Sequence, residues 1–90
     1  GRVVLDELCA LAPRLIAPNG ALLLVQSEFS APRQTVQMLT DSGFLAHTAA
    51  RQMIDFGPVM TARADELEAS GLLEPGRRTE ELVVIRARRL

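Results

Sequence analysis

Apolar residues recur along this chain with two spacings, which divide it into alternating helices and strands. Residues 2–17 have the period of an amphipathic helix. The apolar stripe of this helix is formed by Val4, Leu8, Leu11 and Leu15, with Leu5, Ala12 and Ile16 beside it. Pro13 removes one backbone donor within the pattern, so we expect a kink there. The turn residues Pro18, Asn19 and Gly20 then predict a sharp reversal.

Two stretches are uninterrupted apolar runs rather than alternating ones. Residues 21–27 read Ala-Leu-Leu-Leu-Val-Gln-Ser, and residues 82–85 read Leu-Val-Val-Ile. Such runs are typical of strands that are covered on both faces, so both are predicted to lie inside a sheet. Residues 44–56 mix apolar and charged side chains, which favours a longer and more exposed strand near a sheet edge.

Two further helices are predicted between these strands. Residues 31–42 follow a possible cap at Ser30 and end at Gly43, with Thr35, Val36 and Leu39 as the buried stripe. Residues 59–70 follow Gly57-Pro58 and carry Met60, Ala64 and Leu67 at helical spacing, and Leu72 and Leu73 are expected to pack back onto this helix. The predicted order is therefore helix, strand, helix, strand, helix, strand.

Composition excludes several classes of function. The chain has 90 residues and a formal net charge of -1, which gives no general attraction to nucleic acid or to an anionic membrane. The longest apolar run, residues 21–25, is too short to cross a bilayer. The single cysteine, Cys9, excludes an internal disulfide, and no Cys/His cluster has metal-ligand spacing. We expect a reducing cytoplasm and a core position for Cys9.

A three-stranded sheet leaves one of the two apolar strands on an open edge. An open edge invites pairing with more chain or with another molecule. Because the chain starts with Gly1 directly at a helical pattern, we expect that residues upstream of it complete the sheet.

The order of short motifs resembles the C-terminal part of class I S-adenosylmethionine-dependent methyltransferases. Residues 15–25, Leu-Ile-Ala-Pro-Asn-Gly-Ala-Leu-Leu-Leu-Val, resemble the segment around their fifth strand. Residues 39–44, ending in Gly43-Phe44, look like the junction before the sixth strand, and residues 80–86 look like the last strand. Phe56-Gly57-Pro58-Val59 together with residues 81–86 is similar to relatives of release-factor glutamine methyltransferases.

The resemblance implies an α/β fold over residues 1–90, with three helices and three strands of a Rossmann-like sheet. It implies the strand order 5-7-6, with residues 82–88 as an antiparallel last strand between the other two. It also implies that the S-adenosylmethionine loop and the Asn-Pro-Pro-Tyr-type substrate loop belong to the other half of the domain. No residue of this chain matches those motifs, so no catalytic, cofactor-binding or metal-binding residue is assigned, and the isolated chain is not expected to catalyse the reaction.

Ligands of open α/β sheets bind beyond the carboxyl ends of the parallel strands. Glu28 and Phe29 follow residues 21–27, so they are the candidates for contact with a substrate, with a surface carboxylate and a core aromatic as the alternative interpretation. The segment 56–71 is either a lid over the substrate or plain cover for the sheet edge. His47 is interpreted as a structural or surface position rather than a general base. The groups Arg77-Arg78 and Arg86-Arg88-Arg89 are interpreted as solvated rather than as contacts for nucleic acid or an acidic partner.

Three functions therefore stay open. The first is methyl transfer by the complete protein, with a protein glutamine as a possible acceptor and the missing N-terminal half as partner. The second is a noncatalytic interaction module that uses the open strand edge, which could also pair with its own copy. The third is another Rossmann-like enzyme, such as a nucleotide-dependent oxidoreductase.

Overall fold

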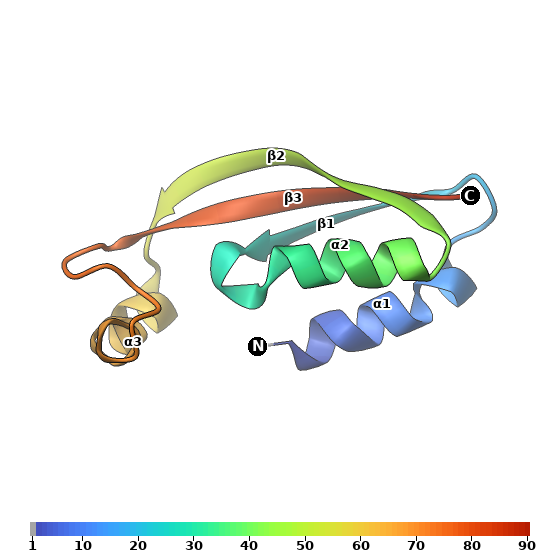
Figure 1. Ribbon diagram of the computed structural model, residues 1–90. Coiled ribbons are helices and arrows are strands. Elements are labelled where there is room, and N and C mark those ends of the chain that lie inside the picture. The colour runs from blue at the N-terminus through green and yellow to red at the C-terminus, as the bar shows by residue number, and fades with distance from the viewer. Residues whose placement is uncertain (1) are drawn as a thin grey trace.

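The computed structural model describes residues 2–90, which form one sheet with two helices on one face and a third helix at one end (Figure 1). The elements in chain order are α1 (Val3–Leu15), β1 (Ala21–Ser27), the 3-10 turn η1 (Glu28–Ser30), α2 (Pro32–Asp41), β2 (Phe44–Asp55), α3 (Pro58–Ala69) and β3 (Thr79–Arg89). All the predicted helices and strands form, and their ends lie close to the expected positions.

The sheet has the order β1-β3-β2, and β3 is antiparallel to both of its neighbours. Leu24 of β1 faces Ile85, and Ala46 of β2 faces Ala87. The strand order and direction expected from the resemblance, with the last strand antiparallel between the other two, are therefore confirmed. β1 and β2 consequently run parallel to each other.

The core lies between the sheet and the two helices α1 and α2. The buried side chains of β3 on this face are Val83, Ile85 and Ala87, and each is fully inaccessible to solvent. They pack with Cys9, Ala12, Leu39 and Phe44 from the surrounding elements. The expected stripe of α2 is confirmed, since Thr35 and Leu39 are buried and Val36 packs against the cluster.

Arg2 fastens the start of α1 to the start of α2. Its guanidinium donates to the carbonyl oxygen of Ser30 at 2.8 Å and to Oγ1 of Thr35 at 2.6 Å, and it pairs with Asp6 on its own helix. Ser30 therefore does not cap α2 as expected. The chain instead leaves β1 through η1, and the cap position is taken by Ala31 in a left-handed conformation with φ of 52°.

The expected stripe of α1 is wrong. Val4 and Leu15 are 76% and 64% exposed, whereas the buried positions are Cys9 and Ala12. These two small side chains allow α1 to lie close against its neighbours, while Val4, Leu11 and Leu15 are exposed and Ile16, after the helix, packs against the core. The helix has apolar residues on two sides, and hydrophobic spacing alone could not decide which side is buried here.

Of the two apolar strands, β1 is the one on the open edge that a three-stranded sheet leaves, and within residues 2–90 only one of its faces is covered. β1 lies at the edge of the sheet, and only the face that carries Leu22 and Leu24 packs against the core. On the other face, Leu23 is 66% exposed and Val25 is 59% exposed. The sheet therefore has one bare face, opposite α1 and α2, as Figure 1 shows.

Candidate functional site

The candidate site lies where the parallel strands end. β1 ends at Ser27 and β2 ends at Asp55, and their registers with β3 place both ends at the same side of the sheet. η1 continues from the first of these ends and α3 follows the second. The rim at which open α/β sheets bind their ligands is thus formed by η1, α3 and the segment before β3.

Glu28 connects the end of β1 to the start of β3. Its Oε1 accepts a hydrogen bond from the backbone N–H of Glu81 at 2.7 Å and also accepts one from the guanidinium of Arg77. The side chains of Glu28 and Arg77 are 28% and 21% exposed, so this pair is partly shielded from water. The carboxylate that is a candidate for substrate contact is therefore held by two donors of the chain itself.

Phe29 belongs to a small second core at the rim. Its ring packs edge-on against Phe56, with 6.4 Å between the centroids, and the guanidinium of Arg77 lies 5.7 Å above it. The buried members of this core are Ala64, Leu67 and Leu73, with Met60 packed against them. The expected packing of α3 is confirmed at Ala64 and Leu67, and of the two leucines after the helix only Leu73 is buried, because Leu72 is 66% exposed.

A hollow of about 540 Å³ opens between η1 and α3. It is lined by Glu28, Phe29, Ala31, Met60, Arg63, Leu67 and Leu72. The structure thus brings the two predicted site residues together in one hollow, although both also hold the rim together. Their contact with a substrate stays a prediction.

Arg77 has a role at this rim that the sequence pattern does not indicate. The interpretation of residues 77–78 as solvated fits Arg78, whose 42% exposed side chain pairs with Glu68 and Asp65. Arg77 instead contacts both Glu28 and Phe29. The strand order indicates this contact, because an antiparallel β3 next to β1 places the start of β3 beside the end of β1.

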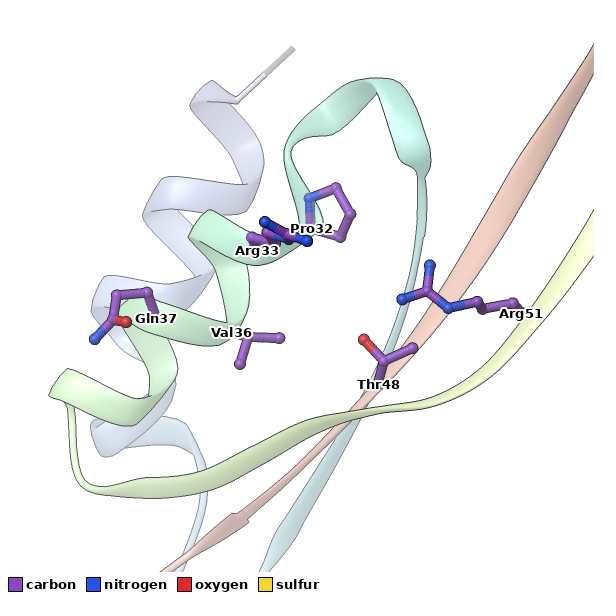
Figure 2. Close-up of a pocket in the computed structure, with 6 residues that line it drawn as sticks. All are labelled: Pro32, Arg33, Val36, Gln37, Thr48 and Arg51. Atoms are coloured by element: carbon purple, nitrogen blue, oxygen red, sulfur yellow. The ribbon is translucent and has the colours of Figure 1, made fainter.

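A second hollow, of about 520 Å³, lies between α2 and β2 (Figure 2). Its lining consists of Pro32, Arg33, Val36, Gln37, Thr48 and Arg51. Arg51 pairs with Glu81 of β3, with 2.8 Å between Nη1 and Oε1. This hollow was not expected from the sequence, because its residues come from two elements whose helical and strand patterns are otherwise ordinary.

The remaining reactive side chains have structural surroundings. Cys9 is 1% exposed, as expected for a core position, and burial raises the pKa of its thiol. His47 lies on an exposed position of β2. Within residues 2–90, no group of three or more His, Cys, Asp or Glu side chains could hold a metal ion. No helix in this part of the chain is long and apolar enough to cross a membrane.

In comparisons with protein-family models, curated proteins and solved structures, no significant match to this chain was found.

Proposed function

We propose that this chain is the C-terminal part of a class I S-adenosylmethionine-dependent methyltransferase domain. The observation that carries the proposal is the strand order β1-β3-β2 with an antiparallel central strand. A strand, helix, strand unit usually places its two parallel strands side by side or leaves room for another parallel strand. Here the strand between β1 and β2 is β3, the last strand, and it runs antiparallel to both. The sequence resemblance implies this arrangement.

An open strand edge and two groups of exposed apolar side chains support the same proposal. One edge of β1 has no neighbouring strand within residues 2–90. The bare sheet face exposes Leu23 and Val25, and on the opposite side of the molecule the outer side of α1 exposes Val4 and Leu15. Large apolar side chains that cluster on an exposed surface often mark an interface. The cofactor-binding half of a methyltransferase would supply a strand beside β1 and helices over the bare face.

In this proposal the chain contributes the substrate side of the rim, and S-adenosylmethionine is held by the other half. Methyl transfer requires that the acceptor is oriented in line with the sulfonium methyl group and is shielded from water. The hollow between η1 and α3 has apolar walls at Phe29, Met60 and Leu72 and polar groups at Glu28 and Arg63. The proposed acceptor is a glutamine side chain of a protein, and the proposed location is the cytoplasm.

The test compares the product of the complete reading frame with the chain of residues 1–90. S-adenosylmethionine binding is measured by calorimetry, and transfer of labelled methyl groups to protein is measured on a cell extract. The proposal expects binding and transfer with the complete product and neither with the 90-residue chain. Binding of a nicotinamide nucleotide by the complete product, with no binding of S-adenosylmethionine, would indicate an oxidoreductase instead.

One observation favours a noncatalytic interaction module as the second candidate. β1 carries no charged side chain and no proline along its open edge, and these are the usual means by which proteins prevent edge pairing. If the complete product binds no cofactor but captures an extended peptide beside β1, this second function holds and methyl transfer does not.

A further inference from the structure

The hollow between α2 and β2 is lined by two arginines that approach it from different elements. Arg33 lies in the first turn of α2, and Arg51 extends from β2 toward the hollow on the other side, next to Thr48 (Figure 2). The wall between them is formed by Val36 and Pro32. The lining therefore combines two guanidinium groups, one hydroxyl group and an apolar wall.

A β-bulge gives Arg51 this direction. The pairing of β2 with β3 shifts between Thr48, which faces Ile85, and Ala50, which faces Val84. In a regular strand, side chains three positions apart point to opposite faces. Because of the extra residue, Thr48 and Arg51 both lie on the helix-covered face, opposite the buried side chains of Ile85 and Val83. Bulges commonly re-aim a side chain beside a functional site.

The charges around the hollow are not balanced. None of its six lining residues is acidic. Arg51 has one carboxylate partner, Glu81, and its side chain is still 57% exposed. Arg33 takes part in none of the side-chain hydrogen bonds or ion pairs found in residues 2–90 and lies at the positive end of α2. The hollow thus has an excess of positive charge and free donors.

We propose that this hollow binds the phosphate group of a small phosphate monoester. A phosphate monoester carries nearly two negative charges and three acceptor oxygens, which suits two guanidinium forks and the hydroxyl of Thr48. A carboxylate offers one charge and two oxygens and would leave one guanidinium unpaired. Pro32 and Val36 provide an apolar wall for the organic part of the ester. The site does not depend on the proposed methyl transfer.

The experiment titrates the ¹⁵N-labelled protein with inorganic phosphate, phenyl phosphate and acetate at constant ionic strength. The amide shifts should be confined to residues 33–37 and 48–51, and phenyl phosphate should bind more tightly than inorganic phosphate, with no saturable binding of acetate. R33Q and R51Q should each weaken phosphate binding about tenfold. R33Q is the cleaner variant because no side-chain hydrogen bond or ion pair found in residues 2–90 is lost with it.

R88Q is the matched control, since Arg88 is exposed on the other face of the sheet and the change in net charge is the same. It should leave the affinity unchanged. As a second readout, phosphate should protect Arg33 and Arg51 from modification by phenylglyoxal, as mapped by mass spectrometry, while Arg88 reacts as before. Equal weakening by R88Q, equal affinities for phosphate and acetate, or protection spread over all arginines would overturn the proposal.

Discussion

Replacing Leu23 by aspartate distinguishes a bare sheet face from a covered one. In the 90-residue chain, the side chain of Leu23 is 66% exposed, and its cross-strand partner on β3 is Arg86. An aspartate there would lose little burial and would gain an oppositely charged neighbour. In the complete protein, the same side chain should lie beneath the proposed N-terminal half.

The size of the effect follows from this exposure. Full burial of a leucine side chain is worth about 1.5–3 kcal/mol, so about a third of that is realised in the 90-residue chain and about 1–2 kcal/mol more would be realised on covering. An ion pair between the introduced aspartate and Arg86 would stabilise the exposed strand by about 0.2–1 kcal/mol. Leu23→Asp should therefore change the free energy of unfolding of the chain by less than about 1 kcal/mol. In the complete protein, the full burial of the leucine would be lost and the carboxylate would be desolvated together with Arg86, so the cost should exceed about 2 kcal/mol.

Urea unfolding of both proteins, with and without the substitution, measures the two costs. Val59→Asp is the matched control, because Val59 is 72% exposed and lies on α3, away from the bare face. It should have a small effect in both proteins. A cost of Leu23→Asp that is equally small in the chain and in the complete protein would refute the reasoning, because it would mean that the bare face stays uncovered.

Three further outcomes are expected. Cys9 should react with iodoacetamide only when the fold opens, so fast alkylation of the native protein would contradict its core position. Because burial raises the pKa of the Cys9 thiol, the folded state should lose stability as the pH rises above the ordinary thiol pKa. The pKa of Glu68 is lowered by the backbone N–H of Gly76, which donates to it at 2.6 Å, so the protection factor of the Gly76 amide, relative to an unstructured amide at the same pH, should fall as the pH falls through that pKa. In Glu68→Ala this protection factor should be low and should not change over the same pH range. Glu28→Ala should lower stability by about 1–3 kcal/mol, and Glu28→Gln, which keeps one acceptor oxygen, should lower it less; equal losses in urea unfolding would show that the hydrogen bond from the Glu81 amide contributes nothing.

The helices and strands could be predicted because their signals are local. The apolar run of residues 21–27, the proline at the start of α2 and α3, and the left-handed Gly43 with φ of 93° each act within a few residues. The order of the strands is a nonlocal property, and only the resemblance could supply it. The buried side of α1 could not be predicted, because it depends on which other elements are present to cover Val4 and Leu15.

The candidate site was predictable as a place and only partly as a set of residues. The rule that ligands lie beyond the ends of parallel strands pointed to Glu28 and Phe29, which the structure brings together in one hollow, and their contact with a ligand stays a prediction. It could not show that Arg77 comes back to the same point, because residues 77 and 28 are distant in the sequence and meet only through the register of β1 and β3. The hollow with Arg33 and Arg51 depends on a bulge, which leaves no clear pattern in the sequence.

The central proposal, that this chain completes a methyltransferase sheet, is tested most directly by reading the DNA upstream of the Gly1 codon in frame for about two hundred codons, a length set by ordinary domain size. The account predicts a strand followed by a Gly-rich loop and, further along, an Asn-Pro-Pro-Tyr-type motif. A start codon directly before Gly1 would contradict it.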